Sequence, residues 1–324
     1  MIEREEIFKD LASPGTKTID AHSHAGVDLT NIVRRRYPIA QSIIDMARKM
    51  NANGITHAAV FPGPSDLFWF DPRKVAFDAV WEQLEKPAER FPYEHANIAH
   101  FAEVELFGNG QIMPFANILP GTKEDEQLNL LKELLDGDRL FGLKLHTLAT
   151  HTHALKLIGS KFTEFATEHS LPIMIHSGPD EYSRPDQIVE VAKKYPDTRI
   201  CIAHTGDYEK DLFAVLTKDG LPNLFTDLAP HITNCYFAQR RDDGKILDLD
   251  YSKPRQVIMD LYKMIPDRLL WGTDEPWTTV TDDNNHKILT KVVYEDEVTL
   301  LGDLPTSVRK DISYTNTMRF LFGR

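Results

Sequence analysis

Two histidines one residue apart stand at the end of the first apolar run of the chain, TIDAHSH at residues 18–24. Alternate side chains of a strand point to the same face, so His22 and His24 can bind one cation together. Imidazole suits zinc and similar divalent metals, and a catalytic metal site keeps one coordination position open for water. The motif alone is weak, because either histidine can simply be exposed. Asp20 shares their face but lies deeper, so we expect it to support the strand or to contact a ligand.

Chemically reactive side chains follow other apolar runs in the same way. These runs end in the segments GLKLH, IMIHSG, CIAHTGD, FTDLAP and WGTDEP. They supply Lys144, His146, His176, His204, Asp227 and Asp274. Catalytic groups of a barrel come from the C-terminal ends of several strands, so we expect these side chains to lie close together. Polar groups at so many matching strand ends are not what a structural core alone would require.

The elements that must position these residues alternate between strand and helix. Runs with strand character lie at 18–21, 55–61, 111–118, 141–145, 172–175, 199–203, 223–226 and 268–271. Helical patterns lie at 40–50, 123–135, 161–169, 185–194, 208–218 and 254–264. This alternation predicts an α/β fold with a parallel sheet, closed as a (β/α)8 TIM barrel. An open doubly wound sheet is the alternative, but no Gly-rich phosphate loop follows any of these strands.

Two connections are longer than is usual for a barrel, after the second and the seventh predicted strands. They cover residues 64–110 and 229–252. Long loops on the C-terminal side of barrel strands usually shape the substrate pocket, although an added pair of surface helices explains much of 64–110 equally well. No repeat or linker divides the chain, so we expect a single domain over residues 1–324.

Composition excludes several classes of partner. The chain has 37 basic and 49 acidic residues, a net charge of −12, which argues against nucleic acid or an anionic membrane. One basic cluster, at 34–36, is interpreted as a solvated face. Without a long apolar run we expect neither a signal peptide nor a membrane helix. Its two cysteines, Cys201 and Cys235, are too few for a disulfide framework, so the cytoplasm is the expected compartment.

As an ordered set, IDAHSHAG, GLKLHT, IMIHSG, IAHTGD, WGTDEPW and RKDISYTNTMRFLFG resemble the amidohydrolase superfamily, most closely its amidohydrolase-2 branch of metal-dependent barrel hydrolases and decarboxylases. The resemblance covers nearly the whole chain. It implies that His22, His24, His176 and Asp274 bind one divalent metal, with Zn²⁺ the expected ion. It also makes Asp274 and His204 catalytic: Asp274 would take a proton from metal-bound water, and His204 would stabilise charge developing on oxygen.

Lys144 leaves the number of metals open. In binuclear members a carboxylated lysine at this position bridges two ions, and His176 and His204 would then hold the second ion. Alternatively, Lys144 binds a substrate carboxylate or a neighbouring acid, as the GLKLH form of mononuclear relatives suggests. The motif context favours the mononuclear site.

Two further side chains are candidate substrate contacts. His146 lies two residues after Lys144 and shares its face, although it can equally be a packing residue. Arg184 lies in the loop after His176, where its guanidinium can bind an anionic substrate in a bidentate fork. A surface pair with an aspartate is the alternative for Arg184. Glu275 departs from the apolar residue that often follows the last aspartate in this family, and it is either a second acid or the partner of a nearby cation.

The function implied by the resemblance is a metal-dependent hydrolase of a small-molecule ester, lactone or amide. The nearest alternative keeps the site and changes the bond: nonoxidative decarboxylation of a small aromatic or unsaturated carboxylic acid. A catalytically inactive barrel that serves as a binding protein is a third class, but all the expected ligands are present. The expected partner is a small molecule, with an anionic one and a homodimer left open.

Overall fold

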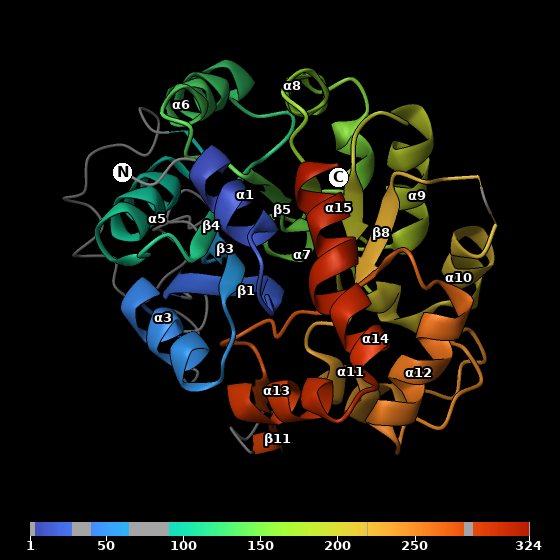
Figure 1. The fold of residues 1–324 in the computed structure, drawn as a ribbon. Coiled ribbons are helices and arrows are strands. Elements are labelled where there is room, and N and C mark those ends of the chain that lie inside the picture. The colour runs from blue at the N-terminus through green and yellow to red at the C-terminus, as the bar shows by residue number, and fades with distance from the viewer. Residues whose placement is uncertain (1–3, 28–39, 65–90, 219, 282–287, 324) are drawn as a thin grey trace, which may run out of the picture.

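A curled sheet of parallel strands forms the centre of the molecule (Figure 1). The computed structural model describes residues 4–27, 40–64, 91–218, 220–281 and 288–323. In sheet order the parallel strands are β1 (Ile19–Val27), β3 (His57–Pro62), β4 (Ile112–Asn117), β5 (Gly142–Leu145), β6 (Ile173–Ile175), β7 (Ile200–Ile202), β8 (Leu224–Asp227) and β9 (Leu269–Leu270). The short strand β2 (Ala40–Gln41) pairs antiparallel with β1.

Hydrogen bonds between β1 and the segment around and after β9 bring the two ends of the sheet together. The backbone N–H of Ala21 donates to the carbonyl of Trp271 at 3.0 Å, and that of His24 donates to the carbonyl of Glu275 at 2.7 Å. The first and last parallel strands are therefore neighbours. This confirms the predicted (β/α)8 TIM barrel, and each predicted strand run overlaps one of its strands.

Helices surround this barrel and follow the predicted order. They are α1 (Arg4–Ala12), α3 (Ile43–Ala52), α5 (Glu94–Phe107), α6 (Glu124–Asp136), α7 (Thr147–Thr150), α8 (Lys161–Glu168), α9 (Pro185–Lys194), α10 (Lys210–Leu216), α11 (His231–Ala238), α12 (Pro254–Met264), α13 (Tyr294–Gly302), α14 (Thr306–Lys310) and α15 (Asn316–Phe322). Short 3₁₀ segments η4 (Ala154–Leu157) and η5 (Ala203–Tyr208), a π turn η6 (Asp311–Thr315) and a hairpin of β10 (Thr279–Thr281) and β11 (Ile288–Lys291) complete the described elements. In α12, Pro254 occupies the first turn, and Val257, Ile258 and Leu261 form the buried face.

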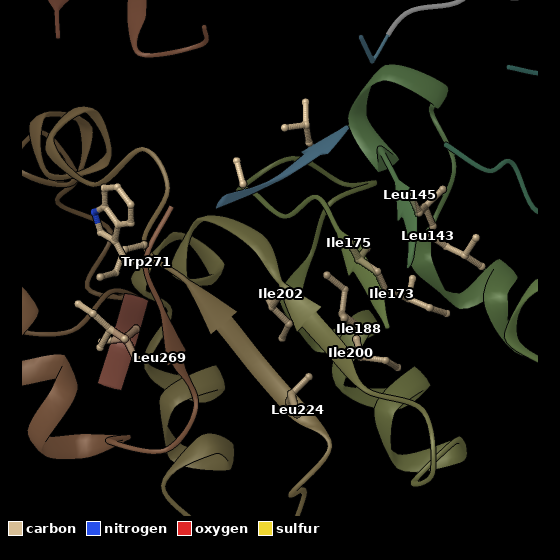
Figure 2. Close-up of a cluster of buried hydrophobic side chains, with 14 of the residues drawn as sticks. Leu143, Leu145, Ile173, Ile175, Ile188, Ile200, Ile202, Leu224, Leu269 and Trp271 are labelled. Atoms are coloured by element: carbon tan, nitrogen blue, oxygen red, sulfur yellow. The ribbon is translucent and has the colours of Figure 1, made fainter. Parts of the chain in front are cut away.

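The strands separate two apolar layers because alternate side chains point in opposite directions. On β6, Ile173 and Ile175 belong to the core between the sheet and the helices, whereas Met174 belongs to the core inside the barrel. Figure 2 shows the outer set, with Ile200 and Ile202 of β7 beside those two isoleucines.

One end of the barrel is covered by the two terminal helices, α1 and α15, which cross in front of the sheet in Figure 1. The rings of Phe8 and Phe322 pack edge to face with centroids 5.2 Å apart. The hydroxyl of Tyr314 donates to the carbonyl of Leu11 at 2.9 Å. This end lies at the N-terminal ends of the strands, so the opposite end is left for polar chemistry.

The two long connections each contain a helix in their described parts. Helix α5 lies within 64–110 and α11 within 229–252, while residues 65–90 of the first connection and the basic cluster at 34–36 lie outside the described residues. Among the helices of the described ranges, none has the length and apolar character needed to cross a membrane.

Candidate metal centre

Three acceptor atoms converge where β1 meets the segment after β9. Nε2 of His22 lies 3.3 Å from Nε2 of His24, and Oδ1 of Asp274 lies 3.3 Å from each of these nitrogens. All three side chains are buried. The rings of His22 and His24 therefore lie together, as the alternation of side chains along a strand predicts.

The hydrogen bonds of His24 show where its proton lies. Its Nδ1 is 3.2 Å from the carbonyl oxygen of Pro62, which can only accept a hydrogen bond. Nδ1 is thus a protonated nitrogen, and in the neutral imidazole Nε2 carries the lone pair.

The same reasoning applies to His22. Its Nε2 lies 3.2 Å from Nζ of Lys144, a donor, while its Nδ1 lies 2.9 Å from Oδ2 of Asp227. Nε2 of His22 is therefore an acceptor as well. Burial lowers the pKa of His22 well below its usual value, with a further contribution from the charge of Lys144, so this imidazole is neutral.

Two imidazole lone pairs and a carboxylate oxygen thus face one another at hydrogen-bond distance. Such a set repels itself unless a cation or a proton lies among its members. The atoms also have the nitrogen and oxygen chemistry that suits a divalent metal such as Zn²⁺. The residues present fit a metal ion.

Asp20 supports this arrangement from below. Its carboxylate accepts hydrogen bonds from the backbone N–H groups of His22 (3.1 Å) and Thr273 (3.0 Å), and from the hydroxyls of Ser23 and Thr273, both at 2.7 Å. Burial raises the pKa of Asp20 to about 6. One side chain therefore ties the strand of His22 to the residue before Asp274, in agreement with the role predicted for Asp20.

His176 and His204 form a hydrogen-bonded pair beside this group. Nδ1 of His176 lies 2.9 Å from Nε2 of His204, and Nδ1 of His204 donates to the carbonyl of Ala229. The pKa of each imidazole is lowered, chiefly by burial, so both are neutral. In that state His176 donates through Nδ1 and keeps a lone pair on Nε2.

His176 is not part of a three-residue ligand group in the described ranges. The two such groups are His22, His24 and Asp274, and His22, His204 and Asp227. Its role as a fourth ligand stays a prediction, supported by the free lone pair on its Nε2.

The backbone at His204 has a conformation that the sequence does not suggest. His204, Thr205, Gly206, Asp207 and Tyr208 all have φ between 54° and 60°, a turn of left-handed helix. Each non-glycine residue in this region costs about 1–2 kcal/mol. Such strain occurs where surrounding structure requires it, often at functional sites. It also delays the fifth predicted helix, which begins at residue 210 rather than 208.

Lys144 lies inside the barrel at the level of this centre. It is fully buried, and its Nζ lies 4.7 Å from the centroid of the Phe61 ring. Burial lowers its pKa to about 8, against the opposing charges of Asp274 and Asp227. Lys144 thus reaches the centre as expected, and its ammonium contacts the lone pair of His22 that a metal would use.

The other two candidate substrate contacts differ in position. The ring of His146 stacks on that of His176 with centroids 4.1 Å apart, and its Nδ1 accepts the backbone N–H of Ala149 at 3.2 Å. Its proton is therefore on Nε2. Arg184 makes an exposed bidentate pair with Asp186, at 3.1 and 2.7 Å, which is the alternative interpretation. A role of Arg184 toward substrate stays a prediction.

The residue whose contacts the sequence did not reveal is Asp227. It ends β8, is fully buried, and contacts His22 and the backbone of His204. Burial raises its pKa to about 7. Its position at a strand end was the only available signal.

Comparisons with known proteins agree with this architecture. A family model described as "Amidohydrolase" matches residues 19–323. No curated protein matches the chain significantly.

Solved structures with the same fold include several at low sequence identity. A probable 2-pyrone-4,6-dicarboxylic acid hydrolase from Acinetobacter baumannii is 14% identical, with a TM-score of 0.58 over 95% of this chain and 100% of that one. A 5-carboxyvanillate decarboxylase from Sphingomonas paucimobilis is 11% identical, with a TM-score of 0.57 over 95% and 99%. An uncharacterized TIM-barrel protein from Bordetella bronchiseptica is 18% identical, with a TM-score of 0.60 over 95% and 100%. These similarities support the barrel fold.

Proposed function

Because the chain belongs to the amidohydrolase family, we propose that it is a metal-dependent hydrolase of a small-molecule ester, lactone or amide. The observation that carries this proposal is the convergence of Nε2 of His22, Nε2 of His24 and Oδ1 of Asp274 at 3.3 Å from one another. We propose that these residues hold one Zn²⁺ ion, with His176 as a fourth ligand through Nε2. When bound, the ion would supply Lewis acidity, which lowers the pKa of water and polarises a carbonyl.

The proton transfers of the reaction are assigned to Asp274 and His204. The carboxylate of Asp274 accepts the proton of the attacking water and returns it to the leaving group. His204, held beside the centre by its 2.9 Å contact with Nδ1 of His176, would take up a proton from solvent at Nε2 and then donate it toward the oxygen on which negative charge develops. The carbonyl of Ala229 accepts from Nδ1 of His204 and so holds the ring in this orientation.

The substrate we propose carries a carboxylate. Lys144 is a buried cation beside the acceptor group, suited to bind an anionic group of the substrate. The names of two structural neighbours, a hydrolase and a decarboxylase, both refer to carboxylic acids. His146 presents a donor on Nε2 that can orient the same substrate.

Nonoxidative decarboxylation is the second candidate reaction. It is favoured by the 5-carboxyvanillate decarboxylase, which resembles this chain as closely in fold as the pyrone dicarboxylate hydrolase does. In that reaction His204 or Asp274 would protonate carbon instead of a leaving group. Release of carbon dioxide from a panel of hydroxybenzoates, with no cleavage of lactones, would favour this second reaction.

The test combines metal analysis with activity. The purified protein is assayed on lactones, esters and aromatic acids before chelation, after chelation and after Zn²⁺ is restored. We expect activity to be lost on chelation and recovered when Zn²⁺ is restored. His22→Ala should be inactive, whereas the control variant His169→Ala, at the C-terminal end of α8, should remain active. Turnover by a metal-free preparation would contradict the proposal.

A further inference from the structure

The carboxylate of Asp227 connects His22 with the strained segment of His204. Its Oδ2 lies 2.9 Å from Nδ1 of His22. Its Oδ1 accepts the backbone N–H groups of His204 at 3.0 Å and Ala229 at 3.1 Å. Sγ of Cys201 also lies 3.9 Å from Oδ2. Both oxygens of this fully buried side chain are therefore occupied, by contacts from four residues.

The proton in the contact between His22 and Asp227 belongs to the histidine. Nζ of Lys144 is a donor and lies 3.2 Å from Nε2 of His22, so Nε2 accepts. A neutral imidazole carries its single proton on the other nitrogen. Nδ1 thus donates to Asp227, and Nε2 is free of a proton.

We propose that Asp227 is a positioning residue that fixes the tautomer of His22, so that the lone pair on Nε2 faces Nε2 of His24 and Oδ1 of Asp274. The same carboxylate, through Oδ1, holds the backbone of His204 beside the centre. Carboxylates that accept from a metal-binding histidine commonly orient the ring and raise its basicity. The effect of Asp227 on metal binding rests on the proposed function, whereas its effect on the tautomer of His22 does not.

A direct ligand role for Asp227 is the competing interpretation. Asp227 forms with His22 and His204 a group whose potential ligand atoms all lie within 4.8 Å of one another. To bind an ion through Oδ2, however, it would have to give up the hydrogen bond from Nδ1 of His22. The two backbone N–H groups already occupy Oδ1. The contacts therefore favour orientation over ligation.

Replacement by asparagine separates these interpretations. In Asp227→Asn the side-chain oxygen must stay toward the N–H groups of His204 and Ala229, because an NH₂ group there would place donor against donor. The amide nitrogen then faces Nδ1 of His22 and donates to it. The proton of His22 is forced onto Nε2, where it blocks the lone pair.

The first measurement is the tautomer in the metal-free full-length protein. With ¹⁵N-labelled histidine, NMR distinguishes a protonated Nδ1 from a protonated Nε2. The signals of His22 are identified as those that are missing from the spectrum of the His22→Gln variant. We expect the proton on Nδ1 in the wild-type protein and on Nε2 in Asp227→Asn. A proton on Nε2 in the wild type, or an unchanged tautomer in the variant, would overturn the proposal. If the variant does not fold, the wild-type spectrum alone decides.

The second measurement is Zn²⁺ affinity, by competition with a chromophoric chelator. Loss of an orienting partner typically weakens metal binding by about 10- to 100-fold, and we expect this for Asp227→Asn. Asp311→Asn is the matched control, since that carboxylate accepts a hydrogen bond from Tyr262 away from the centre, and its affinity should be unchanged. Weaker binding with an unchanged tautomer would identify Asp227 as a ligand and overturn the inference. A wild-type protein that binds no Zn²⁺ would refute the proposed function instead.

Discussion

The side chains of Glu275 and Lys49 form an ion pair that joins the residue after Asp274 to helix α3. The carboxylate of Glu275 is buried, whereas the Lys49 side chain is 36% exposed. Lys49 also donates to Oε1 of Gln41 at 2.7 Å, and Nε2 of Gln41 donates to the carbonyl of His24 at 2.9 Å. Of the two interpretations of Glu275, the structure thus supports a partner for a nearby cation.

Removal of the cation from this pair should destabilise the barrel. Lys49→Met leaves the buried charge of Glu275 unpaired, and we expect the free energy of unfolding to fall by about 1–3 kcal/mol, less than for a fully buried pair because Lys49 is partly exposed. Urea denaturation measures this change. The double variant Lys49→Met, Glu275→Gln removes both charges and should recover most of the loss. Equal destabilisation in the single and the double variant would contradict the coupling.

Asp274→Asn should have opposite effects on metal binding and on stability. The amide nitrogen can donate to the lone pairs of His22 and His24, which the carboxylate repels, so the metal-free protein should gain about 1 kcal/mol. Zn²⁺ affinity should fall by more than about 100-fold, because a ligand rather than its partner is lost. Thermal denaturation of the chelated protein and a Zn²⁺ titration measure the two effects. A metal-free variant less stable than the wild type would contradict this account of the three acceptors.

The left-handed turn at 204–208 makes Gly206 sensitive to substitution. Its φ is +55°, and an added Cβ would overlap Cδ2 of the buried Leu212. We expect Gly206→Ala to lower the free energy of unfolding by about 2–4 kcal/mol, from backbone strain and overpacking together. Gly302→Ala is the control, since no atom lies within 4 Å of its added Cβ and its φ is not positive. Chemical denaturation of both variants tests this, and equal effects would argue against the strained turn.

Alternation along the strands was enough to predict much of this centre. It placed His22 and His24 on one face and Lys144 inside the barrel, because a period of two is a local property of the chain. It could not predict the contact of Asp227 with His22, which are 205 residues apart and meet only in the closed sheet. The left-handed turn escaped prediction for another reason: four of its five residues are not glycine, so local preference opposes the conformation that tertiary contacts impose.

Glu297 predicts a pH dependence of stability that is separate from the metal centre. Its carboxyl is fully buried on α13; Oε1 accepts the backbone N–H of Ile232 at 2.8 Å, and Oε2 has no hydrogen-bond partner among the described residues. Burial raises its pKa from 4.5 to about 8. The folded protein therefore keeps this proton at neutral pH, whereas the unfolded chain releases it.

The sign follows from proton binding in the two states. Below pH 4.5 both states are protonated, so this group does not favour unfolding there. Between pH 4.5 and about 8 the folded state binds more protons, and its contribution to stability falls as pH rises, by up to about 1.4 kcal/mol per pH unit. Glu297→Gln cannot ionise, and its side-chain oxygen can still accept from Ile232. The variant should therefore gain stability relative to the wild type from pH 5 to pH 8.

Urea denaturation at several pH values measures this difference directly. The comparison uses the change with pH rather than the value at one pH, because an unpaired amide at this position can cost about 1–3 kcal/mol at every pH. Glu295→Gln, an exposed carboxylate on the same helix, is the control and should differ from the wild type by a constant amount. A constant difference for Glu297→Gln as well would mean that Glu297 is already ionised in the folded protein, and that the unpartnered Oε2 is stabilised in some other way.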